Sequence, residues 1–292
     1  MSTVYKKPRM IAEIGCNHKG DMEIAKEMIK MAAIYCKADI VKFQKRCVKE
    51  LLTEEQYNAP HPNPAFSYGK TYGEHREFLE FDVEQHKQLQ AWCEEFGITY
   101  STSVWDLTSA KEIASLHPQL IKIPSACNNH YEMLNWLCDN YEGEIHISLG
   151  MTTYDEEEAL VSLFEEKNRA KDLVLYNCTS GYPVPFEDIC LLEINRIKEK
   201  YAGRVKEIGF SGHHLGIAVD IAAYTLGAST IERHYTLDRT WKGTDHAASL
   251  EPEGVRKLKR DLEATYKALT CKTQEVLPIE QVQREKLKYR KH

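Results

Sequence analysis

The stretch EIGFSGHHLGIAVDIAAYTLGASTIERHY (residues 207–235) carries the pattern that decides the fold. Two short β-like runs, at 207–213 and 229–235, flank a segment in which Ile217 and Ile221 are separated by one helical turn. A strand, a helix and a second strand in this order form a βαβ unit, and such units are typical of parallel sheets with helices on their faces.

The same unit recurs along the whole chain. Between the β-like runs lie stretches with apolar residues at helical spacing, and a final helix is predicted at 251–269. The eight β-like runs are at 9–15, 39–44, 98–103, 119–125, 144–150, 173–179, 207–213 and 229–235. An open doubly wound sheet usually has fewer strands and a Gly-rich first turn, whereas GCNHKGD after the first run is not GxGxxG. We therefore predict an α/β fold, the (β/α)₈ TIM barrel.

The 292 residues suffice for one such barrel. We expect a single catalytic domain over residues 1–270. Within it, residues 45–82 are rich in Pro, Asn and aromatic residues and are predicted to form a long irregular loop, acting as a lid or contacting a partner. Residues 271–292 lack a strong apolar face, so we expect an exposed basic tail, helical or frayed.

Charge and composition exclude several classes of protein. The net charge of −6 and the pI near 6.1 argue against a nucleic-acid-binding or membrane-binding surface over the whole protein. No apolar run resembles a signal peptide or a membrane span, so we expect a cytoplasmic protein. The nine cysteines form no CxxC pair and are expected to be reduced.

In a barrel of this kind, catalytic groups lie at the carboxyl ends of the strands. The polar residues that close or closely follow the eight runs are Glu13, Lys42, Gln44, Thr102, Lys122, Ser125, Ser148, Ser180, Tyr182, Ser211, His213, Glu232 and His234. Polar side chains are common near solvent, and any one of these could be structural. Two lysines together with several hydroxyl groups indicate a pocket for a phosphate or carboxylate, and hence an acidic substrate.

Two histidines in this set point to a metal site. His213 and His234 close neighbouring strands and could converge on Mn²⁺, Fe²⁺, Co²⁺ or Zn²⁺, with positions left for water and substrate. Glu13 closes the first strand, which lies beside the eighth in a closed ring. It could act as a general acid or base, or pair with a lysine.

Several segments of the chain carry a resemblance to a known family: IAEIGCNHKGDMEIAKEMI, ADIVKFQK, IKIPSACNN, SLGM, NCTSGYPVP and FSGHHLGIAVDIAAYTLGASTIERHYTLDR, followed by GTDHAASLEP. Together they resemble the sialic acid (N-acetylneuraminate) synthase family over residues 9 to 270. The resemblance implies a catalytic (β/α)₈ barrel, here without the C-terminal antifreeze-like domain that these enzymes usually carry. It also implies a homodimer, and a separate chain could supply the missing domain.

Matching residues receive roles from this resemblance. It implies a divalent metal on His213 and His234, with Mn²⁺ favoured and Mg²⁺ or Co²⁺ as alternatives. Glu13, Lys42 and Lys122 would be catalytic, and Gln44, Tyr182 and Asp245 would bind the sugar. The residues implied to bind phosphoenolpyruvate are Lys42, Thr102, Lys122, Ser125, Ser148, Ser180 and Ser211.

The implied reaction condenses phosphoenolpyruvate with an N-acylated hexosamine such as N-acetylmannosamine. The product would be a nine-carbon 2-keto sugar acid, sialic acid or an analogue, formed with phosphate by metal-assisted C–O cleavage. One alternative is a Schiff-base keto-acid aldolase that uses Lys122. Another is a non-catalytic metal-binding or ligand-binding barrel, suggested by Cys127 and Gly212, where many relatives have Glu and Asp.

Overall fold

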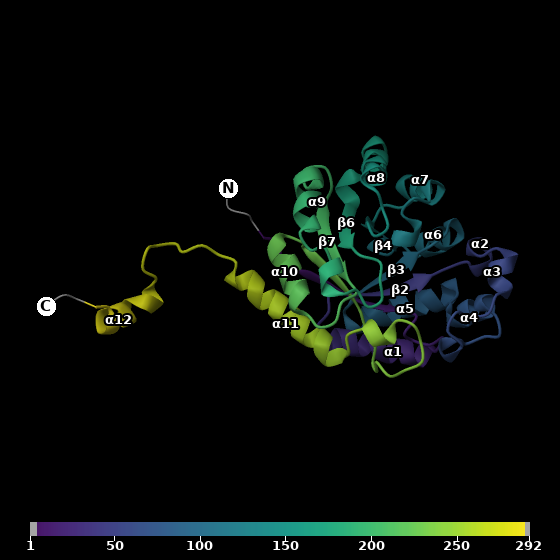
Figure 1. Cartoon of the computed structure of the whole chain (residues 1–292), viewed down its shortest axis with the longest axis horizontal. Coiled ribbons are helices and arrows are strands. Elements are labelled where there is room, and N and C mark those ends of the chain that lie inside the picture. The colour runs from purple at the N-terminus through teal and green to yellow at the C-terminus, as the bar shows by residue number, and fades with distance from the viewer. Residues whose placement is uncertain (1–4, 290–292) are drawn as a thin grey trace.

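The computed structural model of the chain describes residues 5–289. Eight parallel strands follow one another in chain order and close into a barrel (Figure 1). The strands are β1 (Arg9–Gly15), β2 (Ile40–Lys45), β3 (Thr99–Val104), β4 (Leu120–Ile123), β5 (Glu144–Ser148), β6 (Leu173–Cys178), β7 (Glu207–Gly212) and β8 (Thr230–His234). The predicted (β/α)₈ barrel is confirmed, and every predicted strand is present within two residues of its expected bounds.

Helices lie outside the barrel (Figure 1). They are α1 (Met22–Lys30), α2 (Val48–Leu51), α3 (Glu54–Asn58), α4 (Tyr72–Leu79), α5 (Val83–Phe96), α6 (Leu107–Ala114), α7 (Tyr131–Asn140), α8 (Tyr154–Glu166), α9 (Glu193–Tyr201), α10 (Ala218–Leu226), α11 (Pro252–Ala268) and α12 (Pro278–Leu287). Helix α1 continues directly into a π-helical turn, η1 (Met31–Cys36). At least one α-helix joins each pair of successive strands, as parallel pairing requires.

The strand register determines which side chains enter the barrel. A small cluster of Ile11, Ile40, Leu120, Val174 and Tyr176 is separate from the main core that extends between the strands and the helices. Because side chains alternate along a strand, the residues two positions further along lie on the same face. The interior thus changes from apolar to polar toward the carboxyl ends of the strands.

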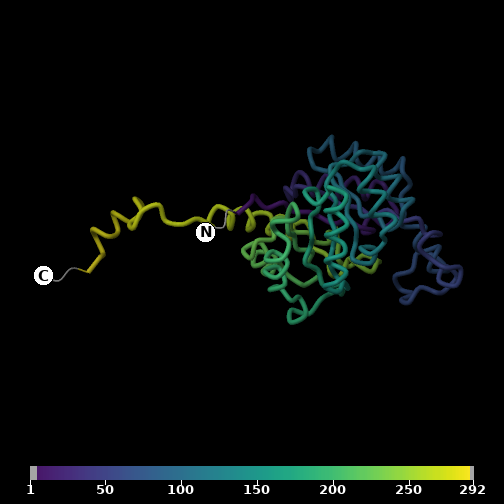
Figure 2. Tube along the Cα trace, turned by 90° about the horizontal axis from the view of Figure 1, so that it is seen from above, coloured from purple at the N-terminus to yellow at the C-terminus, as the bar shows by residue number. Residues whose placement is uncertain are grey.

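The segment predicted as a long irregular loop contains regular structure. Residues 45–82 hold α2, α3 and α4, and Figure 2 shows the blue part of this segment extending to one side of the barrel. Capping boxes start two of these helices, Thr53 with Gln56 at α3 and Thr71 with Glu74 at α4. The expectation of an irregular loop was therefore wrong, and the TxxQ and TxxE spacings were the overlooked signals.

The predicted tail contains α12, none of whose residues is buried. It lies apart from the barrel in both views, joined to α11 by the segment 269–277 (Figures 1 and 2). Over residues 5–289, no helix has the length and apolar character needed to cross a membrane.

Candidate active site

A cavity of about 440 Å³ opens among the carboxyl ends of the strands. The sequence predicted thirteen site residues, and the structure brings twelve of them to the wall of this cavity: Glu13, Lys42, Gln44, Lys122, Ser125, Ser148, Ser180, Tyr182, Ser211, His213, His234 and Asp245. The side chains come from most of the strands and from the loops that follow them. Their gathering in one place agrees with the prediction that polar residues at strand ends form a single site.

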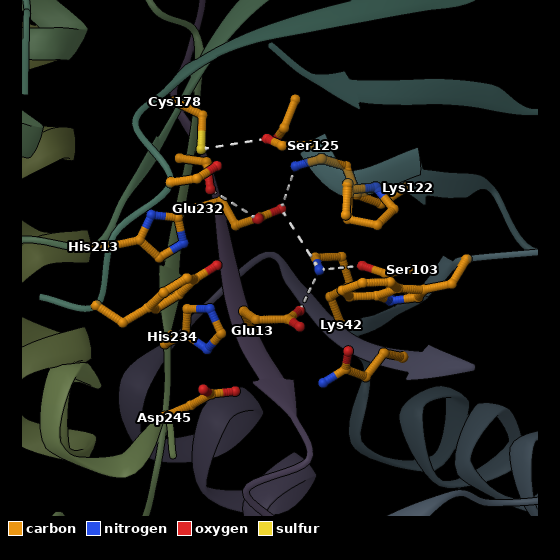
Figure 3. A pocket seen from close by; sticks show the side chains of 18 of the residues that line it. Glu13, Lys42, Ser103, Lys122, Ser125, Cys178, His213, Glu232, His234 and Asp245 are labelled. Carbon is orange, nitrogen blue, oxygen red and sulfur yellow. Dashed lines mark hydrogen bonds and ion pairs between the residues drawn. The ribbon is translucent and has the colours of Figure 1, made fainter. Parts of the chain in front are cut away.

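The centre of the cavity is a cluster of four buried charges (Figure 3). Lys42 Nζ lies 2.5 Å from Glu13 Oε2 and 3.9 Å from Glu232 Oε2, while Lys122 Nζ lies 3.0 Å from Glu232 Oε2. Lys122 also lies 3.7 Å from the centroid of the Tyr176 ring, which closes the cluster from the apolar side. Two carboxyl groups and two lysine side chains thus lie together in one buried cluster.

The two carboxyl groups have opposite pKa shifts. Burial, reinforced by the negative charge of Glu232, raises the pKa of Glu13 to about 8, although Lys42 opposes the shift. Burial alone would also raise the pKa of Glu232, but Lys122 and Lys42 outweigh it and lower that pKa. Two acids whose surroundings separate their pKa values in this way are suited to different tasks. Glu13 is suited to exchanging a proton, and Glu232 to remaining a fixed anion.

Glu232 was noted as a strand-end residue in the sequence but was given no role. It precedes His234 by two residues on β8, so both side chains lie on the interior face. Its Oε1 accepts a hydrogen bond from Ser211 Oγ at 3.1 Å. The period of two was the signal that could have assigned Glu232 to the site.

Thr102 is the one predicted residue that does not reach the cavity. Its hydroxyl donates to Tyr100 Oη at 2.6 Å, and the side chain is fully buried. The pairing of Lys42 with Ser101, and of Gln44 with Ser103, places the odd-numbered residues of β3 on the interior face. Ser103 lines the cavity and accepts a hydrogen bond from Lys42 Nζ at 2.6 Å. On β3 it is therefore Ser103, and not the predicted Thr102, that reaches the cavity wall.

Four serines line the wall near the lysines: Ser125, Ser148, Ser180 and Ser211. Gly150 lies against them, and its N–H donates to Ser125 Oγ at 3.1 Å. A Cβ at position 150 would come within 2.4 Å of Ser180 Oγ and 2.7 Å of Ser125 Oγ, so only glycine allows this close approach. Hydroxyl groups beside two lysines can hold an anion through charge-assisted hydrogen bonds.

His213 and His234 lie close together at the ends of β7 and β8, with ring centroids 5.3 Å apart and the rings tilted by 48° (Figure 3). Burial lowers the pKa of both rings, that of His213 to about 3, and the neutral form is the one that binds a metal. His234 Nδ1 is buried without a hydrogen-bond partner among the described residues. The pair therefore fits a divalent metal ion. In residues 5–289 no group of three or more His, Cys, Asp or Glu residues has metal-site geometry.

The outer wall of the cavity carries residues that the sequence did not reveal. Arg46 and Trp105 follow β2 and β3, and Arg76 comes from α4. Arg46 forms an ion pair with Glu80. Among the described residues, Arg76 is the one cation of the cavity wall without a carboxylate at ion-pair distance, and its Nη2 donates to Tyr72 Oη. Within the described part of the chain, the outer wall thus holds one guanidinium, that of Arg76, with no carboxylate at ion-pair distance.

Comparison with known proteins identifies relatives of the whole barrel. Residues 28–274 match the model of the NeuB family. The chain is 37% identical over 278 residues to N-acetylneuraminate-9-phosphate synthase of Homo sapiens, covering 95% of this chain and 76% of that protein. It is 32% identical to N,N'-diacetyllegionaminic acid synthase of Campylobacter jejuni, covering 90% of this chain and 78% of that protein. The crystal structure of an N-acetylneuraminic acid synthetase from Leptospira borgpetersenii superposes with a TM-score of 0.81 at 28% identity, covering 98% and 94%.

Proposed function

The chain belongs to the NeuB family, and we propose that it condenses phosphoenolpyruvate with an N-acylated hexosamine to give a nine-carbon 2-keto sugar acid and phosphate. Relatives that match most of the chain are named as synthases of sialic acid-type sugars, so this chain is an enzyme that forms a carbon–carbon bond. The observation that carries the proposal is the cavity itself, which combines an anion-binding wall, a pair of neutral histidines and two carboxyl groups with separated pKa values.

Phosphoenolpyruvate would lie against Lys42, Lys122 and the serine wall. The two ammonium groups neutralise an anion that would otherwise repel its reaction partner, and the hydroxyl groups of Ser125, Ser180 and their neighbours fix its orientation. Glu232 lies 3.9 Å from Lys42 and 3.0 Å from Lys122 and helps to hold both side chains in place. Holding two substrates in one orientation lowers the entropic part of the barrier.

The acceptor sugar would lie toward Gln44, Tyr182 and Asp245. A divalent ion held by His213 and His234, with Mn²⁺ as our first choice, would supply Lewis-acid polarisation of the aldehyde oxygen. C3 of phosphoenolpyruvate then forms a bond to the aldehyde carbon, water adds at C2, and the C2–O bond to phosphate breaks. Glu13, beside Lys42, is the group best suited to take or give a proton in these steps, because its raised pKa lies near neutral pH.

The acceptor could also be phosphorylated at C6, which becomes C9 of the product. The relatives with 37–38% identity are named N-acetylneuraminate-9-phosphate synthases, whereas those named for legionaminic acid are 32% identical. Arg76 supports this candidate because its guanidinium lines the outer wall without a carboxylate partner among the described residues. A guanidinium can bind a phosphate through two parallel hydrogen bonds.

The Schiff-base alternative requires Lys122 as a neutral amine. Burial, together with Lys42, lowers the pKa of Lys122, which favours that alternative, but Glu232 lies only 3.0 Å away and favours the ammonium form. We therefore place Lys122 as a cation that binds phosphoenolpyruvate. Borohydride trapping of a pyruvate adduct on Lys122 would reverse this choice.

The proposed function is tested by phosphate release from phosphoenolpyruvate with N-acetylmannosamine or its 6-phosphate, with and without Mn²⁺. Wild type should release phosphate only when sugar and metal are both present, and mass spectrometry should find a nine-carbon keto acid. His234→Ala should abolish release, whereas His117→Asn, a change at an exposed histidine, should not affect it. Metal-independent release, or no keto acid with either sugar or with diacetamido-hexoses, would contradict the proposal.

A further inference from the structure

The two proposed metal ligands each have a neighbour that points out of the barrel. His213 and His234 line the cavity. His214, which follows His213, and Arg233, which precedes His234, are buried in the layer outside the strands. This follows from the alternation of side chains at the ends of β7 and β8. The outer layer therefore contains groups attached directly to both ligand-bearing positions.

Arg233 connects β8 to the loop that follows β7. Its Nη2 donates to the carbonyl oxygen of His214 at 2.5 Å, and its Nη1 lies 2.7 Å from the carbonyl oxygen of Gly216 and 3.0 Å from His214 Nε2. The same Nη1 lies 2.6 Å from Asp220 Oδ2, in the first turn of α10. A single guanidinium thus contacts the loop at three points and the following helix at one.

Gly212, the residue before His213, leaves space for the contact between Arg233 and His214. Gly212 pairs with Arg233 across β7 and β8. A Cβ at position 212 would lie 2.8 Å from His214 Cε1 and 2.9 Å from His214 Nδ1, so the glycine leaves room for the imidazole that meets Arg233. This gives a physical account of the glycine at position 212.

The buried charge needs an explanation beyond stability. Arg233 is 1% exposed and Asp220 is 0% exposed, and a buried ion pair often contributes no more than apolar residues of the same size would. What such a pair can provide is a fixed arrangement of the elements that it joins. Here those elements are the strand that carries His234 and the loop that carries His213.

We infer that Arg233 is a positioning residue that sets the separation of His213 and His234 and so tunes their affinity for a divalent ion. Arg233 touches neither substrate nor metal. It acts through the His214 and Gly216 carbonyl groups on one side and through its own place in β8, next to His234, on the other. The inference rests on the proposed metal-dependent function.

The test measures Mn²⁺ binding to the purified chain by electron paramagnetic resonance of free Mn²⁺ and by isothermal titration calorimetry. Arg233→Lys keeps the charge beside Asp220 but cannot reach both carbonyl groups. Outer-layer partners of metal ligands typically change affinity by about 10–100-fold, so we expect a rise in Kd of at least about tenfold. Gly212→Ala should act in the same direction by displacing His214 while Arg233 is retained.

Lys259→Met is the matched control. Lys259 is a buried cation of α11 that pairs with Asp39 at 2.6 Å, outside the cavity wall, so its loss should lower the melting temperature and leave the Kd for Mn²⁺ unchanged. Arg233→Lys with native circular dichroism and the wild-type Kd would overturn the inference alone. Wild type that binds no Mn²⁺ would overturn the proposed metal function together with it.

Discussion

Lys122 on β4 and Glu232 on β8 meet inside the barrel, with Nζ 3.0 Å from Oε2 and side chains only 2% and 8% exposed. Glu232 also lies 3.9 Å from Lys42, so one carboxylate pairs with two lysine side chains. This ion pair thereby links opposing strands of the barrel at the depth where phosphoenolpyruvate is proposed to bind.

Glu232→Gln should reduce both activity and stability. Removing one partner of a buried ion pair typically costs about 3–5 kcal/mol, and Lys122 would lose the carboxylate that lies 3.0 Å from its Nζ. We expect kcat for phosphate release to fall at least about 100-fold and the free energy of unfolding in urea to decrease. Wild-type kcat in this variant would mean that Glu232 has no part in arranging the lysines.

Ser103 and Thr102 provide a test between neighbouring positions. Ser103→Ala removes the hydroxyl that accepts from Lys42 in the cavity, and should raise KM for phosphoenolpyruvate about tenfold, because a hydrogen bond to a charged group contributes about 1.5–3 kcal/mol. Thr102→Ala loses only the bond to Tyr100 behind the strand, so it should lower the melting temperature and leave KM unchanged. The reverse pattern would restore the original assignment of Thr102.

Arg76→Ala should distinguish the two kinds of acceptor. If Arg76 binds a sugar phosphate, KM for N-acetylmannosamine 6-phosphate should rise about 10–100-fold, as expected for loss of a charge-assisted contact, while KM for the unphosphorylated sugar should change little. Arg256→Ala on the outer face of α11 is the control and should affect neither value. Equal effects on both sugars would argue against a phosphate contact.

Buried histidines should make the fold sensitive to acid. Burial, followed by the nearby charges of Lys45 and His18, lowers the pKa of His86 to about 3, against 6.5 for the free side chain. Below pH 6.5 the unfolded chain therefore binds a proton at His86 that the folded chain does not bind. Stability is fully present above pH 6.5 and falls by up to about 1.4 kcal/mol per pH unit as the pH drops from there toward 3.

Urea unfolding of wild type and His86→Gln between pH 7.5 and 5 would measure this contribution. The variant should be less stable at pH 7.5, because the contact with Tyr100 Oη is altered, but should lose stability more slowly on acidification. The exposed His117→Asn change should leave the wild-type pH dependence intact. Parallel pH curves for wild type and His86→Gln would exclude His86 as a source of acid sensitivity.

The sequence predicted the barrel because each strand is a short apolar run and each helix has apolar residues at helical spacing. Both patterns depend only on residues that are close in the sequence. It also predicted that His213 and His234 would meet, since closed-barrel geometry brings the ends of neighbouring strands together. Thr102 was assigned incorrectly because neighbouring positions on a strand face opposite sides. The register of β3 against β2, which decides between Thr102 and Ser103, is not a local property.

Arg76 could not be predicted at all. It reaches the cavity from α4, in a segment outside the repeating βα pattern, and only the path of the chain brings its side chain to the wall. The helices of that segment were within reach of prediction, because the capping boxes that begin with Thr53 and Thr71 are visible in the sequence.

The pairing of Glu13 on β1 with His234 on β8 joins the first and last strands of the barrel. A ribosome must therefore release residue 234 before the two residues can meet, and the catalytic centre forms at the seam where the barrel closes. Contacts between such distant parts of a chain form slowly in folding. Ligands that bind in the cavity would contact both sides of this seam. They should therefore slow the separation of β1 from β8, and so assist folding as well as take part in the reaction.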